Sequence, residues 1–364
     1  MTGILAAVDR TARTLLGDDR PAPPPGLELV PTRSLTTAAP VVWLPLGIGD
    51  RVLVRTGDAV TAGTPLIERM RDVELVDPSG RRRSSRMSRR PAVVEDAPPA
   101  IIGRRSGDWH AEVSGGPAGE LAMRLDGGWR IATGEPAEVV EAPAAGIVRE
   151  VRPGLGMALA TNGAALAGAR ALGGPTRGRL EIVGGSDAEL RPSALDVGRA
   201  GTILVAGSRV DAETLIRARA MGIRGVVVAG LSEKDARDFA ASELRQQASL
   251  HRPPPFGVLV LDGSIRRPIA GPVIALLAAA AGREVGIAAD PPCLLLGNEA
   301  PEPPALEPDH VRVVHGPLAG SEGRWTGPAG LRRFRAGIHL EAGLVDIEGT
   351  GRVAVPLADL ERFV

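Results

Sequence analysis

The chain has 364 residues, no formal net charge at pH 7 and 24% charged residues. This composition is typical of a folded globular protein and excludes an intrinsically disordered chain. At roughly 150 residues per domain, the length predicts two to three domains. Lys234 is the only lysine among the 43 basic residues, so any chemistry that needs a second lysine is excluded.

The cysteine content and the apolar runs bear on the cellular compartment. Cys293 is the only cysteine and cannot form an intramolecular disulfide, which favours a reducing compartment. The apolar run at the N-terminus is shorter than the core of a signal peptide. The uncharged apolar stretch at residues 268–282 is too short to cross a bilayer. We therefore expect a cytoplasmic protein with no membrane partner.

Residues 1–17 are expected to form an amphipathic helix. Ile4, Leu5 and Val8 recur at helical spacing, and Gly17 would end the helix. A helix of this kind either docks on the body of the protein or binds a partner. The next residues, 18–26, contain four prolines and are predicted to be an extended linker.

Residues 41–68 alternate Val and Leu with polar residues between glycines, which predicts short strands and turns. Residues 57–66 follow the pattern Gly-Asp-x-Val-x-x-Gly-x-x-Leu, and residues 142–148 follow Ala-Pro-x-x-Gly-x-Val. The matching residues are Gly57, Asp58, Val60, Gly63, Leu66, Ala142, Pro143, Gly146 and Val148. These two stretches resemble the two halves of a biotinyl/lipoyl-type barrel-sandwich domain. The resemblance implies a barrel-sandwich β domain over residues 38–175.

Carrier members of this family attach biotin or lipoate to a lysine in an exposed hairpin. Residues 38–175 contain no lysine, so the resemblance implies a β scaffold without biotin or lipoate attachment. No cofactor is expected. Between the two halves, residues of about 78–135 are predicted to be an arginine-rich insertion.

The insertion carries a local surplus of positive charge. Residues 81–105 contain eight arginines, among them Arg81, Arg82 and Arg83, and two acidic residues. Clustered arginines attract phosphate groups by releasing counterions. The segment is therefore either a contact for a macromolecule or a solvated loop. It contains no aromatic residue, which disfavours base stacking.

Residues 176–297 are predicted to form a central α/β domain with a parallel or mixed sheet. Continuous apolar runs are typical of strands that are buried on both faces, and helices are expected between them. The predicted strands are 202–206, 225–229, 256–262 and 284–289. The first predicted helix is 211–221, with Asp211 as its N-cap. The second is 232–249 and opens with a capping-box pattern. The third begins at Pro272 and ends before Gly282.

Three small turns with a serine follow the predicted strands of this domain. Open α/β sheets bind ligands at the carboxyl ends of their strands, so these turns and the arginines beside them form a hypothetical site for a small anion. The candidate ligand-binding residues are Ser208, Arg209, Ser232, Ser264, Arg266 and Arg267. Glycine and serine are also ordinary turn and N-cap residues, and no dinucleotide-binding or Walker loop accompanies them.

Residues 291–308 are rich in proline and are predicted to link this domain to a last unit at 309–364. The unit begins with the pattern Val-x-Val-x-x-Gly-x-x-x-Gly-x-x-Gly. The matching residues are Val311, Val313, Gly316, Gly320 and Gly323. This pattern resembles the KOW motif of NusG-type transcription factors and several ribosomal proteins. The resemblance implies a small β-barrel that binds RNA, RNA polymerase or ribosomal partners.

A basic loop with one aromatic residue follows the motif. The candidate macromolecule-binding residues of this unit are Gly316, Gly320, Arg332, Arg333, Phe334 and Arg335. Arginines around an aromatic ring suit a phosphate with a stacked base or a groove on a protein. Acidic residues nearly balance the arginines of the unit, which favours a protein partner over RNA.

The sequence contains no recognisable catalytic arrangement. The five histidines lack metal-ligand spacing, and there is no Gly-x-Ser-x-Gly nucleophile elbow. Cys293 lies between two prolines and three leucines, a context typical of a buried small side chain rather than a reactive thiolate.

Together these patterns predict a multidomain protein that combines a barrel-sandwich β domain, a central α/β domain and a small C-terminal β-barrel. We expect a non-catalytic adaptor or scaffold that binds RNA, the transcription or translation machinery, or a protein assembly through the KOW-like barrel. The alternative is an enzyme, or a sensor of a small anion, that uses the carboxyl edge of the α/β sheet. A structural subunit of a larger complex is a third interpretation, and the sequence leaves the oligomeric state open.

Overall fold

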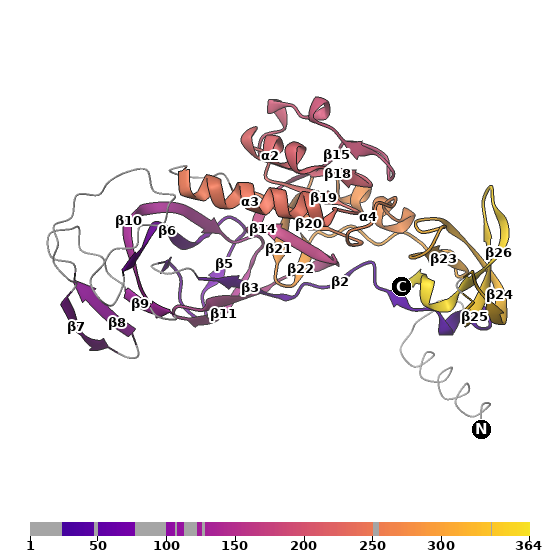
Figure 1. Cartoon of the computed structure of the whole chain (residues 1–364), viewed down its shortest axis with the longest axis horizontal. Coiled ribbons are helices and arrows are strands. Elements are labelled where there is room, and N and C mark those ends of the chain that lie inside the picture. Colours follow the sequence, from indigo (N-terminus) through magenta and orange to yellow (C-terminus); the bar gives the residue numbers. More distant parts are fainter. Residues whose placement is uncertain are drawn as a thin grey trace, which may run out of the picture. The chain divides into compact units, whose positions relative to one another are not determined.

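The structure is a computed structural model that describes residues 24–46, 50–76, 100–105, 108–112, 122–125, 128–249, 255–335 and 337–364. The chain forms two compact units. The terminal unit comprises the residues up to Ser34 together with Pro304–Val364, and the central unit is Leu35–Pro303. The protein is mostly β-sheet, in several sheets with few helices (Figure 1).

Some of the predicted features lie outside the described residues. These are the helix at 1–17 and Arg81, Arg82 and Arg83 of the insertion. Within the part of the chain that the structure describes, no helix is long and apolar enough to cross a membrane.

The terminal unit is built on one six-stranded sheet with the order β1-β27-β23-β24-β25-β26. Its strands are β1 (Thr32–Arg33), β23 (His310–Val313), β24 (Glu322–Arg333), β25 (His339–Ile347), β26 (Gly351–Pro356) and β27 (Leu360–Phe363). Single turns of 3-10 helix, η1 (Leu27–Leu29) and η4 (Leu357–Asp359), precede β1 and β27. Alternating apolar side chains of the strands form the core, since successive strand residues face opposite sides. They include Val311, Val313, Trp325, Val345, Ile347, Val355 and Leu360.

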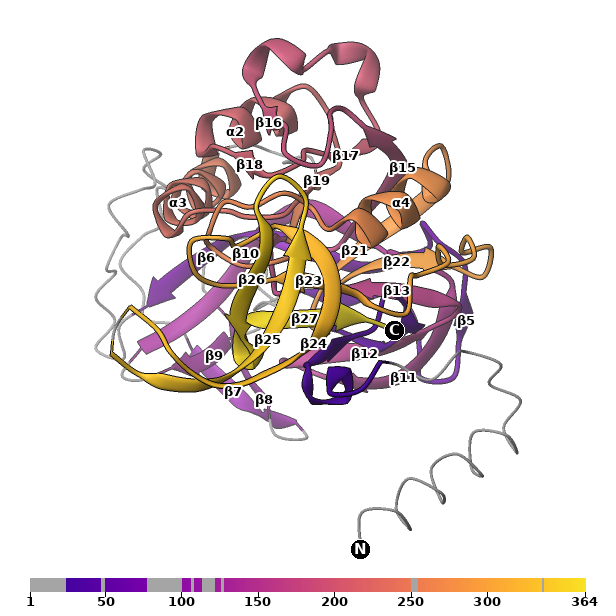
Figure 2. The same ribbon diagram turned by 90° about the vertical axis from the view of Figure 1, so that its right-hand side faces the viewer.

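Residues 24–34 complete this sheet from the other end of the chain. β1 pairs in parallel with β27, and Leu27 and Val30 are buried in the same core. The indole Nε1–H of Trp325 donates to the carbonyl oxygen of Pro25 at 3.2 Å. Figure 2 shows this indigo segment beside the yellow C-terminal strands. The sequence predicts a unit of residues 309–364 alone, because the two-residue strand β1 has no periodicity that would reveal it.

In the central unit, two sheets contain the stretches that resemble a barrel-sandwich domain. One sheet has the order β3-β12-β11-β5 and the other the order β4-β6-β10-β9-β8-β7. Their strands are β3 (Val41–Pro45), β4 (Arg51–Val52), β5 (Ala59–Val60), β6 (Pro65–Val76), β7 (Ala100–Arg105), β8 (Asp108–Glu112), β9 (Ala122–Leu125), β10 (Gly128–Glu141), β11 (Gly146–Arg152) and β12 (Gly156–Thr161).

The two stretches fold together although more than 70 residues separate them. The Gly57 N–H donates to the Val148 carbonyl oxygen at 2.8 Å, and the Val148 N–H donates to the Asp58 carbonyl oxygen at 2.9 Å. A second pair of bonds joins the same two stretches. The Gly63 N–H donates to the Ala142 carbonyl oxygen, and the Ala142 N–H donates to the Thr64 carbonyl oxygen. Apolar side chains from both stretches share one core. In Figure 1, purple β5 accordingly lies beside magenta β11.

The rest of the central unit is a nine-stranded mixed sheet with the order β14-β20-β19-β17-β15-β21-β22-β13-β2. Its strands are β2 (Thr37–Ala38), β13 (Ala164–Ala167), β14 (Arg170–Gly173), β15 (Thr176–Ile182), β17 (Thr202–Val205), β19 (Gly225–Val228), β20 (Gly257–Val260), β21 (Glu284–Ala289) and β22 (Pro292–Gly297). Strands β15, β17, β19 and β20 are parallel to one another. A separate two-stranded sheet pairs β16 (Glu189–Leu190) with β18 (Arg209–Val210).

Three helices accompany the large sheet: α2 (Ala212–Ala220), α3 (Glu233–Ser249) and α4 (Gly271–Ala280). The short 3-10 turns η2 (Pro192–Ala194) and η3 (Val197–Arg199) precede β17. The carboxylate of Asp211 accepts from the Thr214 N–H at 2.7 Å and so caps α2. Helices α2 and α3 pack together over one face of the sheet, where alternate residues such as Leu204 and Val226 share a core with Leu215 and Phe239.

The boundaries inside this region differ from those drawn on the sequence. The sequence predicts separate domains at 38–175 and 176–297, but β2, β13 and β14 extend the large sheet, so both stretches contribute to it. The predicted linker at 291–308 begins later, because β22 pairs with β21 and β13 and its residues Leu294 and Leu295 are buried. Proline content alone therefore places the start of the linker too early, because the prolines at 291 and 292 are followed by buried leucines of β22.

Candidate functional site

The three serine turns meet at the carboxyl edge of the parallel strands, as the sequence analysis expected. The Ala229 N–H donates to the Gly207 carbonyl oxygen at 2.9 Å, and the Leu231 N–H donates to the Gly263 carbonyl oxygen at 3.0 Å. These bonds link the turn after β17 to the turn after β19, and the turn after β19 to the turn after β20. The candidate residues of the edge are therefore neighbours.

The hydroxyl groups of two of these serines already serve the fold. Ser208 is fully buried, and its Oγ donates to the Asp187 carbonyl oxygen at 2.9 Å. The Nε–H of Arg266 donates to the same Oγ at 3.3 Å. Ser232 Oγ accepts from the Asp235 N–H at 3.1 Å, which makes it the cap of α3. Neither hydroxyl needs a ligand to be satisfied.

The arginines of this edge lie beside carboxylates. Arg209 Nε is 3.7 Å from Glu189 Oε1, and Arg266 Nη2 is 3.8 Å from Asp187 Oδ1. The remaining two candidates are Ser264, which is exposed, and Arg267, which is buried. A neighbouring carboxylate cancels much of the attraction that an arginine has for an anion. The arrangement therefore favours a structural role for the edge over an anion site.

In the terminal unit, the motif glycines shape the loop between β23 and β24. Gly316 and Gly320 have φ angles of +83° and +93°, a region that side chains with a Cβ rarely adopt. The Gly320 N–H donates to the Val313 carbonyl oxygen at 2.7 Å, which closes the loop. These two candidates act through backbone conformation.

The other candidates of this unit lie at the end of the hairpin formed by β24 and β25. Residues 331–333 pair with 339–341, and neither β23 nor β26 extends this far along the ribbon. Three apolar side chains of this distal part are 62%, 55% and 40% exposed; they belong to Leu331, Ile338 and Leu340. A two-stranded ribbon that exposes apolar side chains gains little from its own packing, which is typical of a surface that a partner covers.

The two faces of this distal hairpin differ in character. Arg332 pairs directly with Leu340, and the Phe334 N–H donates to the Ile338 carbonyl oxygen at 2.9 Å. Since side chains alternate along a strand, these four residues share one face, which is mostly apolar. The opposite face carries Leu331 and Arg333 with their partners Glu341 and His339.

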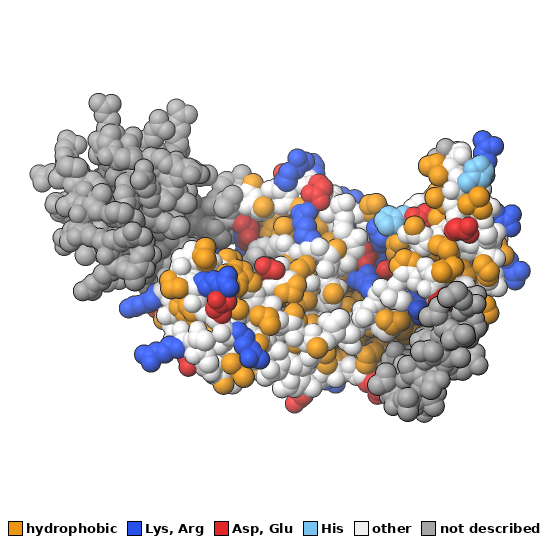
Figure 3. Space-filling view, turned by 90° about the horizontal axis from the view of Figure 1, so that it is seen from below, with side chains coloured by type: hydrophobic (Ala, Val, Ile, Leu, Met, Phe, Trp, Pro, Cys, Tyr) orange, Lys and Arg blue, Asp and Glu red, His pale blue; other side chains and the backbone are white. Residues whose placement is uncertain are grey.

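Basic charge is in excess at the distal end of the hairpin. Arg332, Arg333 and Arg335 are exposed, and Glu341, which pairs with Leu331, is the one carboxylate of residues 331–341. None of the three arginines forms an ion pair with another residue in the part of the chain that the structure describes. Elsewhere, on the face shown in Figure 3, blue and red side chains are interspersed over the described residues, without an extended surface of one sign.

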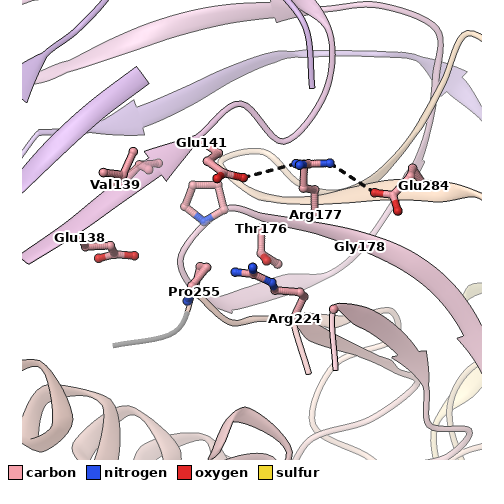
Figure 4. Close-up of a pocket in the computed structure, with 12 residues that line it drawn as sticks. Glu138, Val139, Glu141, Thr176, Arg177, Gly178, Arg224, Pro255 and Glu284 are labelled. Carbon is pink, nitrogen blue, oxygen red and sulfur yellow. Dashed lines mark hydrogen bonds and ion pairs between the residues drawn. The ribbon is translucent and has the colours of Figure 1, made fainter. Parts of the chain in front are cut away.

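Two neighbouring hollows in the central unit escaped the sequence analysis. The first has a volume of about 180 Å³ and is shown in Figure 4. There Arg177 lies between two carboxylates, with Nε 3.3 Å from Glu141 Oε2 and Nη1 3.5 Å from Glu284 Oε2. Arg224 lies near Thr176 on the other side of this hollow. Because its arginine and carboxylates satisfy one another, the Arg177 side of the hollow is a salt-bridge network.

The second hollow has a volume of about 230 Å³ and shares Glu138 with the first. Its lining includes Trp43, Arg69, Glu138, Arg219, Glu243 and Phe256. Burial raises the pKa of Glu138, and the guanidinium of Arg69 lowers it by less. Burial likewise raises the pKa of Glu243, against the opposing effect of Arg219. Carboxyl groups with raised pKa values in a hollow are typical of binding and catalytic sites.

A sequence signal for this second hollow did exist. Arg219 follows Leu215 by four residues on α2, and Glu243 follows Phe239 by four residues on α3. Side chains four apart lie on the same face of a helix, so both charges fall on buried faces. A charged residue at a core position of an amphipathic helix is the feature that would have found them.

Comparison of the chain with protein-family models, with curated proteins and with solved structures gives no match.

Proposed function

We propose that the protein is a non-catalytic adaptor that binds another protein through the distal end of the β24–β25 hairpin. The observation that carries this proposal is the combination, at residues 331–340, of exposed apolar side chains and arginines without ion pairs. Interfaces place apolar anchors at their centre and charged groups around them. The partner should therefore offer an apolar groove bordered by carboxylates.

The proposed KOW-type barrel agrees with this role. In the terminal unit, the motif residues cover β23, the following loop and the start of β24. The strand β27, which follows the 3-10 turn η4, returns to pair with β23. In the family, such barrels bind macromolecules, so a contact hairpin on this unit supports the adaptor function.

A protein partner is favoured over RNA by the side chains of the hairpin. Its mostly apolar face exposes aliphatic residues, whereas a surface that binds single-stranded RNA uses aromatic rings as stacking platforms. Phe334 is the one aromatic residue in this part of the hairpin, and it is half-buried. We therefore propose a barrel-sandwich scaffold and a KOW-type barrel that act together as a protein-binding adaptor.

The test is a site-specific photo-crosslinker placed at Ile338 of the full chain in its native cells. The control places the same crosslinker at Leu155, which is 62% exposed in the central unit. We expect a protein adduct from position 338 that is absent from position 155. A crosslink to RNA, or identical adducts from both positions, would refute the proposal.

The partner identified in this way is then purified, and its affinity for variants of the full chain is measured. Reversal of Arg332, Arg333 and Arg335 to glutamate should weaken binding by about tenfold or more, because each charge at a complementary rim is replaced by a repulsive one. The matched control, whose charge change is the same, reverses three exposed arginines of the central unit: Arg55, Arg149 and Arg217. Equal affinities of the two triple variants would contradict the assignment of the hairpin.

A further inference from the structure

The second hollow of the central unit combines groups from several separate segments. The lining includes Trp43 from β3, Arg69 from β6, Glu138 from β10, Arg219 from α2 and Glu243 from α3. All of these elements belong to one compact unit, so their arrangement is a property of the fold. The proposed adaptor hairpin uses none of them.

Arg219 is the central group of this hollow. Its side chain is only 2% exposed, and its guanidinium carbon lies 5.5 Å from the ring centroid of Phe239. One terminal nitrogen, Nη1, donates to Glu243 Oε1. The other two nitrogens, Nε and Nη2, have no hydrogen-bond partner among the described residues. Buried donors of a charged group are almost always satisfied, so a missing acceptor is expected to come from a ligand.

The guanidinium group of Arg69, which also lines the hollow, has a nitrogen without a hydrogen-bond partner as well. The Nε of Arg69 is buried and has no hydrogen-bond partner among the described residues. Its nearest charged partner, Asp50, has its Oδ2 4.0 Å away, which is an ion pair but too long for a hydrogen bond. Two arginines of the lining therefore have buried donors without a hydrogen-bond partner among the described residues.

The carboxyl groups of the lining decide what charge a ligand can carry. Glu138 and Glu243 face the same hollow as the two arginines, so positive and negative side chains balance. A free anion would be repelled by the carboxylates and a cation by the guanidinium groups. A neutral molecule that both accepts and donates hydrogen bonds satisfies both kinds of group.

The size and the aromatic residues of the hollow limit the ligand further. Its volume of about 230 Å³ lies below the range of about 300–1,000 Å³ that is typical of pockets for drug-sized molecules. Phe256 is buried and Trp43 is half-buried in the lining. Trp43 packs closely on the backbone at Gly156, where an added Cβ would lie 2.4 Å from its ring. Fixed rings beside polar groups suit a flat ligand.

We propose that this hollow binds a small, neutral, planar heterocycle that carries a carbonyl oxygen next to a ring N–H, as oxopurine and oxopyrimidine bases do. The guanidinium groups of Arg219 and Arg69 donate to the carbonyl oxygen and to ring nitrogens. The carboxylates of Glu243 and Glu138 accept from the ring N–H groups. The same alternation of donors and acceptors along one edge is what proteins recognise in nucleobases.

The proposal is tested by titration calorimetry and thermal denaturation of the full chain with hypoxanthine and uracil as probes. The comparison compounds are unsubstituted purine, which lacks the carbonyl oxygen, and inorganic phosphate. We expect saturable binding of at least one oxo-heterocycle with a Kd below about 1 mM, with a rise of the melting temperature at saturation. Binding of purine or phosphate that is as tight as that of the probes, or no binding of either probe at about 1 mM, overturns the proposal.

Variants assign the binding to this hollow. Arg219→Met and Glu138→Gln should each weaken binding of the probe by about tenfold or more, because each removes one hydrogen bond of a buried polar set. Glu138 is less buried than Arg219, so Glu138→Gln keeps the test available if Arg219→Met fails to fold. The control is Arg177→Met, which alters the neighbouring hollow alone. Equal affinities of Glu138→Gln and the control would refute this site.

Discussion

The attachment of residues 24–34 to the C-terminal sheet gives the sharpest prediction for stability. Leu27 is 1% exposed and packs in the core of the terminal unit, whereas Leu29, on the same 3-10 turn, is 63% exposed. Leu27→Ala removes three buried carbon atoms, which at about 0.8 kcal/mol each is about 2.4 kcal/mol. The cavity that remains raises the expected loss to about 3 kcal/mol.

Hydrogen exchange followed by mass spectrometry on the full chain measures this loss locally. Peptides that cover β23–β27 should exchange faster in Leu27→Ala, since the opening free energy of the terminal unit falls. Peptides that cover β17 and β19 in the central unit should be unchanged.

Leu29→Ala is the matched control, because it deletes the same atoms from an exposed position of the same turn. It should change the opening free energy by less than about 0.5 kcal/mol. If the two variants exchange alike over β23–β27, residues 24–34 are not part of the core. The terminal unit would then be the C-terminal segment alone.

Three further outcomes follow from buried ionisable groups. Arg312 is fully buried with its Nη1 3.0 Å from Glu361 Oε1, so Glu361→Ala should destabilise the terminal unit by about 3–5 kcal/mol in urea denaturation. Burial raises the folded-state pKa of Glu138 above its ordinary 4.5, so the fold loses stability as the pH rises from about 4.5 to the folded-state pKa and stays less stable above it. Glu138→Gln should therefore stabilise the protein at about pH 7 and have no effect below about pH 4. Burial raises the pKa of Cys293 to about 12, so iodoacetamide should label this thiol at about pH 8 in urea but not in the folded protein.

The repeating strand–helix–strand pattern of the central unit could be read from the sequence. The runs at 202–206, 225–229 and 256–262 contain β17, β19 and β20, and the runs 211–221 and 232–249 contain α2 and α3. Strands that are buried on both faces have no polar residues to obscure them. Local capping signals then place the helix starts.

Strands that depend on distant partners could not be predicted in this way. β2, β13 and β14 have two to four residues each, and their partners lie more than 80 residues away in the chain. β1 is a further case, since its partner β27 lies at the opposite end of the chain. Elements of this length are held by the sheet that they join, so their own residues carry too little periodicity to mark them.

Local signals in the sequence indicate turns and caps rather than ligand sites, which explains where the predicted ligand residues differ from the structure. A serine after a strand is a good indicator of a turn or a cap, and Ser208 and Ser232 serve those purposes. A residue whose hydrogen bonds are all used by the fold has little left for a ligand. The capacity to bind appears instead where the fold leaves buried donors unsatisfied, as at Arg219. That condition depends on which segments meet in space, so it becomes visible only when α2, α3, β3 and β10 are placed around one hollow.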